Sequence, residues 1–281
     1  MDAPLNPIGP PPAVLLIDKS VLSVDPRYQR SMSEKRSAAA VARIVREFDW
    51  HKFGALVCAD NADGTYVVID GQHRLHAALE IGEIRSVPCV VPDAETLKEQ
   101  AEAFVGINKG RVNINPLQIF HAERIAGDET ALAIARVLDA SGCSIPRNVK
   151  HSSAMRAGEI LSVSAVASAV KVYGEAKARR ALSILREAYP EGGGDLRGPL
   201  IAGVVRLIGL AAVEAKSGGP EIDDARLVAA IAEQAGEDWI RAGRALSEHL
   251  VSTKLPDAIR MVVVRAYNRN LPQTRRLPWD R

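Results

Sequence analysis

The chain has 281 residues, of which 47% are hydrophobic, 25% are charged and only 4% are aromatic, with a formal net charge of +2 at pH 7. This balance is that of a soluble globular protein of one large or two ordinary domains, and a charge of +2 does not identify a polyanionic partner. With so few aromatic residues the core has to be aliphatic and Ala-rich, which favours helices.

The sequence also argues against a membrane-bound or a secreted protein. No apolar run reaches the roughly 18 residues that span a bilayer, and residues 1–12 do not have the pattern of a signal peptide, so we expect no membrane association. The chain has three cysteines, Cys58, Cys89 and Cys143, which are widely spaced and odd in number. We therefore expect reduced, buried thiols in a cytoplasmic protein without a disulfide framework or a zinc site.

The first part of the chain alternates strand-like and helix-like segments after a Pro-rich tail at 1–12. The patterns predict strands over 14–17, 22–24, 55–58, 66–69 and 86–91 and helices over 34–48, 75–81 and 95–107. The Asp63-Gly64 turn between the third and fourth strands predicts a hairpin. In the last helix we expect four side chains to face inward: Leu97, Ala101, Phe104 and Val105.

From Asn115 onward the strand signals almost vanish. Asn115-Pro116 is a favourable helix start, because Asn caps free backbone N–H groups and Pro lacks the one that would be wasted. Helices are predicted over 116–126, 129–141, 154–173, 176–189, 199–216, 223–234, 239–250 and 257–268. The sequence thus predicts a flexible tail over 1–12, a mixed α/β domain over 13–114 and an all-α domain over 115–281.

The strongest local motif is Asp70-Gly71-Gln72-His73-Arg74, where a β-branched strand runs into a helix. A helix that starts at such a turn presents free N–H groups and the positive end of its dipole, which suits an anion. Gly71 permits close approach of the backbone, and Arg74 can hold two phosphate oxygens at once. The alternative is that Asp70 caps the helix while His73 and Arg74 are ordinary surface residues.

The motif, followed by Ala77-Ala78, Gly82 and Val87-Pro88, resembles the second conserved box of the ParB/sulfiredoxin superfamily. ParB-type domains carry Gly-Glu-Arg-Arg at this turn and sulfiredoxins carry Gly-Cys-His-Arg. The resemblance implies a ParB/sulfiredoxin-like α/β (α+β) domain that binds nucleotide phosphates here, CTP as in ParB or ATP as in sulfiredoxin. Gln72 replaces the catalytic Cys, so the chemistry of sulfiredoxin is excluded.

Two further segments fit the same order. Residues 25–30, Asp-Pro-Arg-Tyr-Gln-Arg, resemble the first box, and the resemblance implies that Arg30 closes over the phosphates, with a similar role open to Arg27. Asn108-Lys109-Gly110-Arg111, followed by Asn115-Pro116, resembles the third box and adds Asn108 and Arg111 to the phosphate ligands. Ile107 stands where ParB has a Glu associated with Mg²⁺, which weakens the expectation of a metal–triphosphate site.

Other candidates depend on residue type alone. Asp70 is a candidate catalytic base for phosphate hydrolysis, although capping of the helix is the favoured reading. His73 and His76 share a helical face, but Arg74 between them opposes a cation and we predict no metal site. Trp50 and Phe53 could stack on a base; a role as core anchors is favoured.

ParB follows this domain with a DNA-binding helix-turn-helix, but here no recognition helix stands out. Candidate nucleic-acid contacts are Arg147 and Lys150 in a basic connector and Arg275 and Arg276 near the C-terminus, where a simple solvated basic surface is an equal alternative.

Three functions follow as hypotheses. The first is a ParB-like, nucleotide-binding protein associated with double-stranded DNA in a phage, plasmid or mobile-element setting, in which the nucleotide changes how the helical domain packs or dimerises. The second is an NTPase, nuclease or phosphotransferase on the same fold. The third is an interaction protein whose nucleotide pocket is vestigial, for which Ile107 is the best support.

Overall fold

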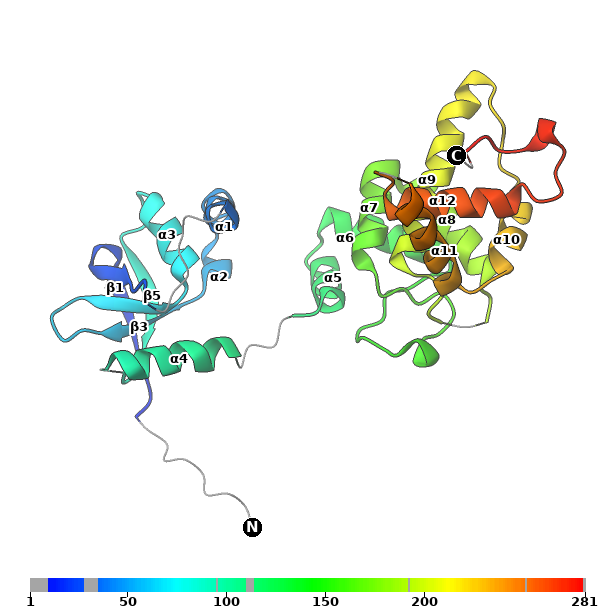
Figure 1. Cartoon of the computed structure of the whole chain (residues 1–281). Coiled ribbons are helices and arrows are strands. Elements are labelled where there is room, and N and C mark those ends of the chain that lie inside the picture. The colour runs from blue at the N-terminus through cyan, green and yellow to red at the C-terminus, as the bar shows by residue number, and fades with distance from the viewer. Residues whose placement is uncertain are drawn as a thin grey trace, which may run out of the picture. The chain divides into compact units, whose positions relative to one another are not determined.

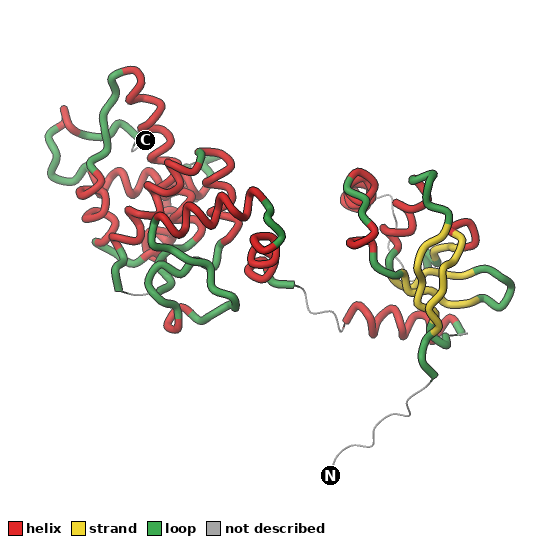
Figure 2. The backbone as a smooth tube through the Cα atoms, turned by 180° about the vertical axis from the view of Figure 1, so that it is seen from behind, coloured by secondary structure: helices red, strands yellow, loops and turns green. Residues whose placement is uncertain are grey.

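The structure is a computed structural model that describes residues 10–27, 35–94, 96–109, 114–191, 193–250 and 252–279. The chain forms two compact units, Met1–Asn113 and Ile114–Arg281. Figure 2 shows the strands confined to the N-terminal unit, whereas the C-terminal unit is built of helices. The described chain therefore combines a mixed α/β unit with an α-helical one.

The N-terminal unit is built on a five-stranded sheet in the order β1-β5-β3-β4-β2. The strands are β1 (Ala13–Asp18), β2 (Leu22–Val24), β3 (Leu56–Asp60), β4 (Tyr66–Asp70) and β5 (Ser86–Val91). β3 and β4 form the predicted antiparallel hairpin, whereas β2 runs parallel to β4 with Val24 opposite Val68. Since β2 and β4 are parallel and adjacent, the segments that follow them leave the sheet at the same edge.

Helices cover both faces of this sheet (Figure 1). One face carries α1 (Lys35–Arg46), the short α2 (Trp50–Phe53) and α3 (Gln72–Glu80), and the other carries α4 (Leu97–Lys109). The alternation of side chains along β4 explains the two cores, because Val68 faces a cluster with Leu56 and Leu75 while Val67 and Ile69 face Phe104 and Ile107 of α4.

The buried face of α4 differs from the predicted one. Leu97 is 41% exposed and Val105 is 54% exposed, whereas Gln100 is buried. The residues that pack on the sheet are Gln100, Ala103, Phe104 and Ile107, which have the helical spacing i, i+3, i+4, i+7. Phe104 packs on the sheet as predicted, whereas the predictions for Leu97 and Val105 are wrong, because the sequence offers apolar residues on both faces of α4.

Aromatic packing near α2 also corrects an expectation. Phe53 is buried as predicted, but Trp50 is 52% exposed. The Trp50 ring meets the rings of Phe48 and Phe53 edge-on, at centroid distances of 5.0 Å and 5.4 Å. Trp50 therefore covers the rim of this small aromatic cluster and is not a core anchor.

The C-terminal unit consists of helices packed around one large aliphatic core. They are α5 (Pro116–Ile125), α6 (Glu129–Ala140), α7 (Val163–Tyr173), α8 (Glu175–Ala188), α9 (Gly198–Glu214), α10 (Asp224–Ala232), α11 (Gly236–His249) and α12 (Leu255–Tyr267). The predicted start at Asn115 is confirmed: its side chain accepts from the N–H of Leu117 and forms a capping box with Gln118. α9 lies centrally, in contact with α7, α8, α11 and α12.

The predicted helix over 154–173 begins later than expected, at Val163. The preceding segment is held in an extended course by two backbone hydrogen bonds, from Ser144 to Gly158 and from Ile160 to Ser144. Gly158 adopts φ +80°, which a helix cannot contain. Long-range pairing therefore overrides the local helical pattern.

Among the described residues, one helical stretch, residues 198–217, is long and apolar enough to cross a membrane by length and composition alone. This stretch contains α9, and 56% of its most apolar window is buried inside the unit, as in the central helix of a folded core. Arg206 interrupts its apolar sequence.

Candidate functional site

The Asp-Gly-Gln-His-Arg motif forms a sharp strand-to-helix turn. β4 ends at Asp70, Gly71 adopts φ +104°, and α3 begins at Gln72. A Cβ at Gly71 would lie 2.5 Å from Cδ2 of Leu56, which is fully buried. Both the backbone conformation and the close approach require glycine at this position. The N-cap residue of α3 is Gly71, which has no side chain, and the positive end of the α3 dipole lies at this turn.

The Arg74 side chain folds back over this strand-to-helix turn. Its Nη1 donates to the carbonyl oxygens of Phe53, at 3.1 Å, and Ala55, at 2.7 Å. Its Nη2 donates to Oδ2 of Asp70 at 3.0 Å, and the Arg74 and Asp70 side chains are 21% and 13% exposed. The guanidinium thus joins the turn to the loop before β3. The N-cap position of α3 belongs to Gly71, and Asp70, the last residue of β4, pairs with Arg74.

Gln72 and His73 occupy the first turn of α3 and are half-buried, as is His76 one turn later. Among the residues that the structure describes, no group of three or more His, Cys, Asp or Glu side chains lies close enough to hold a metal ion.

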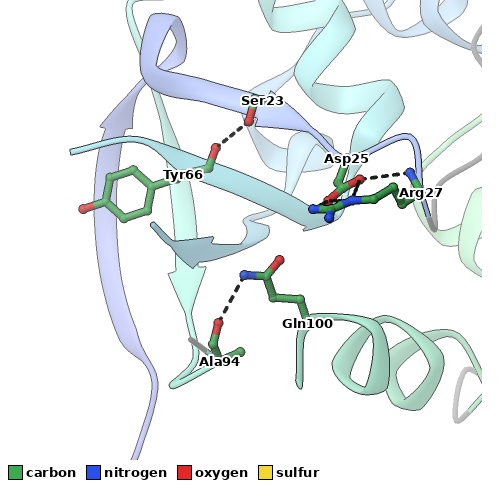
Figure 3. Close-up of polar contacts among 6 residues, drawn as sticks. All are labelled: Ser23, Asp25, Arg27, Tyr66, Ala94 and Gln100. Carbon is green, nitrogen blue, oxygen red and sulfur yellow. Dashed lines mark hydrogen bonds and ion pairs between the residues drawn. The ribbon is translucent and has the colours of Figure 1, made fainter. Parts of the chain in front are cut away.

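The first box begins where β2 ends. Asp25 is buried and accepts from the backbone N–H of Arg27 at 2.9 Å, and both its oxygens contact the Arg27 guanidinium (Figure 3). The Arg27 side-chain hydrogen bonds, aided by its backbone N–H, hold the pKa of the Asp25 carboxyl below its usual value. Tyr28, Gln29 and Arg30 lie outside the described residues.

A cavity of about 540 Å³ lies beside the first box, between β2, β4 and α4. Ser23, Asp25 and Arg27 line it from the β2 side and Leu97 and Gln100 from α4, together with Val24, Pro26, Asn61 and Val67. In Figure 3 the Gln100 amide reaches up from α4 toward the sheet; its Nε2 donates to the carbonyl of Ala94 at 3.4 Å. The cavity therefore offers apolar walls with a few hydrogen-bonding groups, as small-molecule sites commonly do.

Gln100, Ser23 and Asn61 were missed by the sequence reasoning. A signal for Gln100 was present, since it is the polar member of the i, i+3, i+4, i+7 series that packs on the sheet, and a buried polar side chain needs a partner. Ser23 is the exposed middle residue of β2 and Asn61 is an exposed residue just after β3, and neither carries a comparable signal.

The third box starts at the end of α4. Nδ2 of Asn108 donates to the carbonyl of Phe104 at 2.8 Å, and Ile107 packs against the α4-side core that contains Ile69. Ile107 therefore has a packing role on the sheet, where a carboxylate would be costly to bury. Gly110 and Arg111 lie outside the described residues.

The candidate nucleic-acid contacts belong to the other unit. Arg147 is exposed, whereas Nζ of Lys150 is 2.7 Å from Oε1 of Glu159, which is only 9% exposed. Arg275 and Arg276 are exposed on a segment that is anchored at both sides. Buried Leu277 exchanges two hydrogen bonds with the Asn268 side chain, so the C-terminal basic residues lie on an ordered surface.

Comparisons with known proteins find a ParB protein that is similar to part of the chain. Over 103 residues it is 31% identical to the probable chromosome-partitioning protein ParB of Treponema pallidum (strain Nichols), which covers 36% of this chain and 30% of that protein. The chain thus matches less than a third of this relative's length.

Among solved structures, it is similar to the C-terminally truncated chromosome-partitioning protein ParB from Caulobacter crescentus complexed with CTP-gamma-S. That similarity has a TM-score of 0.38 and 14% identity, and covers 64% of this chain and 99% of the other. The model of DUF6551, described as a family of unknown function, matches residues 25–278. Since this match spans nearly the whole sequence, the chain belongs to the DUF6551 family.

Proposed function

We propose that this protein binds a nucleoside triphosphate, CTP or ATP, at the strand-to-helix turn of its N-terminal unit. The observation that carries the proposal is the turn itself: a left-handed Gly71 opens α3 with no side-chain cap, and the α3 dipole points its positive end outward. The similarity of the chain to ParB over 103 residues supports the same assignment.

In this proposal the phosphates bind to the backbone of Gly71 and Gln72 and to the His73 side chain. Arg74 contributes its positive charge, while its hydrogen bonds to Asp70 and to two backbone carbonyls fix the shape of the turn. Arg30, Asn108 and Arg111 complete the phosphate shell from the first and third boxes. Mg²⁺ accompanies the triphosphate through the nucleotide's own oxygens, which are the hard ligands that it prefers.

The base and ribose extend toward the cavity beside β2. Val67 lines that cavity and Asp70 starts the turn three residues later on the same strand, a separation of about 10 Å at 3.3 Å per residue. The Gln100 amide supplies both donor and acceptor groups for the edge of a base. Replacing Gln100 by Leu is therefore expected to change the preference among bases more than the affinity for the triphosphate.

Association with double-stranded DNA belongs to the same proposal. The relative in Treponema pallidum is described as a probable chromosome-partitioning protein, and the helical unit carries exposed Arg147, Arg275 and Arg276. Exposed arginines contact phosphates without reading sequence, so binding would weaken steeply with salt. The phage or plasmid setting and the nucleotide-dependent pairing of two copies are further parts of this hypothesis.

The test is calorimetric titration of the whole chain with CTP, ATP and GTP, with and without Mg²⁺. We expect micromolar binding of one nucleotide and a loss of about tenfold or more in His73→Ala, since a hydrogen bond to a charged group contributes about 1.5–3 kcal/mol. His76→Ala is the matched control, because His76 lies one turn further along α3. Equal binding by both variants, or no binding by the parent, would refute the proposal.

Phosphate release measured in the same samples separates binding from hydrolysis. If the protein is an NTPase with Asp70 as base, Asp70→Asn should abolish release while the nucleotide still binds. Release that persists in Asp70→Asn assigns hydrolysis to other groups.

A further inference from the structure

The helical unit contains a basic cavity of about 470 Å³ that is separate from the nucleotide site proposed above. Its basic lining consists of Lys150 and the His151 imidazole on the segment before α7, Arg197 at the start of α9 and Arg244 on α11. None of the residues lining the cavity is Asp or Glu. A concave site with several positive groups and no negative one favours an anion.

The acidic partners of these cations lie outside the cavity lining. Lys150 pairs with Glu159 at 2.7 Å, and Nη2 of Arg197 pairs with Glu237 at 3.1 Å. Nε of Arg197 is buried without a hydrogen-bond partner among the described residues. The guanidinium of Arg244 makes no hydrogen bond or ion pair to any side chain in the described parts of the chain. Arg244 therefore gives the cavity a charge that no described acid offsets.

Two helix N-termini open onto the same cavity. α9 starts after Arg197 and α7 after Ser162, and neither N-cap residue makes a side-chain capping bond. Ser162 and Gly198 lie in contact, because a Cβ on Gly198 would be 2.8 Å from Oγ of Ser162. The starts of α7 and α9 therefore meet at one wall of the cavity, where both helix dipoles have their positive ends.

The other walls of the cavity are tightly packed and partly apolar. Gly194, with φ +105°, lets the turn before α9 approach Ser152, since a Cβ there would lie 2.9 Å from Cβ of Ser152. The apolar lining consists of Met155, Leu161, Leu196, Pro199 and Ile240. A volume of about 470 Å³ exceeds what an inorganic ion fills and falls in the range of sites for small organic molecules.

We propose that this cavity binds a small organic phosphomonoester. Its phosphoryl group lies between Arg197 and Arg244 at the N-termini of α7 and α9, with His151 and Ser162 as further donors. Its organic part packs on Leu161 and Ile240. The proposal is independent of the nucleotide site, because all of these residues belong to the helical unit.

Phenyl phosphate is the probe, because it joins a phosphoryl group to an apolar ring. We expect calorimetry on the full chain to detect phenyl phosphate and to find it bound at least about tenfold more tightly than inorganic phosphate, since the ring buries apolar surface. Arg244→Gln should weaken phenyl phosphate by about tenfold or more. Thermal unfolding should be unchanged, because Arg244 has no described partner to lose.

Arg241→Gln is the matched control. Arg241 is an exposed residue of α11, as Arg244 is, but it pairs with Asp238 and does not line the cavity. Equal loss in Arg241→Gln and Arg244→Gln, or no binding of phenyl phosphate by the parent, would overturn the proposal.

A second arm uses a duplex oligonucleotide with and without a 5′-phosphate. If Arg244→Gln weakens binding of the duplex but not of phenyl phosphate, the assignment of the cavity to a small ligand is overturned in favour of nucleic acid. If no nucleotide binds at the turn, the proposal for this cavity still stands, because His73 belongs to the N-terminal unit and the cavity belongs to the helical unit.

Discussion

An alanine substitution at Arg74 would not distinguish a structural role of its side chain in the turn from a contact with phosphate. Its guanidinium holds Asp70 and the carbonyls of Phe53 and Ala55, so its removal disturbs the turn whether or not a phosphate binds there. A loss of nucleotide binding in Arg74→Ala therefore does not by itself identify a phosphate contact. For this reason His73 is the better residue to test.

The structural task of Arg74 can be measured directly with Arg74→Lys. An ammonium keeps the charge but lacks the planar fork that reaches three acceptors, so we expect a loss of about 1–3 kcal/mol in the free energy of unfolding. Urea denaturation without nucleotide checks this. Arg85→Lys is the control, because Arg85 is 90% exposed and only 3.4 Å from a half-exposed Asp18; a similar loss there would show that the Arg74 bonds are not special.

A pH-dependent contribution is expected from Glu159. Burial would raise the pKa of this carboxyl, but hydrogen bonds from Lys150 and from the N–H of Arg156, and their charges, hold it below the usual value. A depressed native pKa stabilises the fold above the unfolded value of about 4.3, and that stabilisation is lost as the pH falls through the native pKa.

We therefore expect the helical unit of the parent to lose stability between about pH 5 and pH 3 more steeply than that of Glu159→Gln. Thermal unfolding across this range gives the comparison. Parallel pH profiles for the two proteins would contradict the assigned role of the Lys150–Glu159 pair.

At the residue scale, the sequence predicts what depends on local chemistry. Asn115 was recognised as a cap and Gly71 as the hinge of a turn, since both follow from backbone requirements of adjacent residues. The acceptors of Arg74 at Phe53 and Ala55 could not be predicted, because they are backbone groups about twenty residues upstream that no side-chain pattern marks.

At the scale of elements, a close helix crossing in the C-terminal unit depends on glycines. Ile259 of α12 fits between Gly203 of α9 and Gly243 of α11: a Cβ at Gly203 would lie 2.7 Å from its Cγ2, and one at Gly243 would lie 2.5 Å from its Cγ1. Both contacts are shorter than packed carbon atoms tolerate. The helices can approach because these positions have no side chain.

A double-mutant cycle tests this crossing. Gly203→Ala should destabilise the unit by about 1–3 kcal/mol through overpacking, and Ile259→Ala by about 2–5 kcal/mol through a cavity. The double variant should lose less than the sum, by about 0.5–3 kcal/mol, because the new methyl group fills part of the space that Ile259 left.

Gly106→Ala on α4 is the control for helix propensity. A Cβ there meets nothing within 4 Å, so this change should be neutral or stabilising by about 1 kcal/mol. Strict additivity of Gly203→Ala and Ile259→Ala would show that the two residues are not coupled.

The sequence predicted helices and strands correctly where the hydrophobic periodicity and the turn-forming residues agree. β5 was predicted at its observed bounds, and the β3–β4 hairpin followed from its Asp-Gly turn. It failed where a distant segment decides: Ser144 holds the chain before α7 extended, and the sheet selects the face of α4 that carries Gln100. Neither partner is visible within a local window of sequence.

At the scale of the whole molecule, each unit has hydrophobic cores of its own. Among the described residues, the large cluster around Leu200 and Ile201 contains residues from Leu117 onward, and the clusters around Leu56 and Ile69 contain residues up to Ile107. A unit with a closed core can fold by itself.

We accordingly expect fragments 1–113 and 114–281 to fold separately. Each should give a cooperative thermal transition, and the sum of the two circular dichroism spectra should match that of the full chain. Phenyl phosphate should raise the transition of 114–281 alone, and a bound nucleotide that of 1–113. A fragment that remains unfolded would show that its unit depends on the other for stability.

The bond between Arg74 and the carbonyl of Ala55 has a consequence for how this region can vary in evolution. A backbone carbonyl is supplied by every residue type, so the bond places no demand on the side chain at position 55. Saturation mutagenesis should find position 74 intolerant and position 55 permissive. Statistical coupling between the two columns of an alignment would then be absent, although the residues are in direct contact.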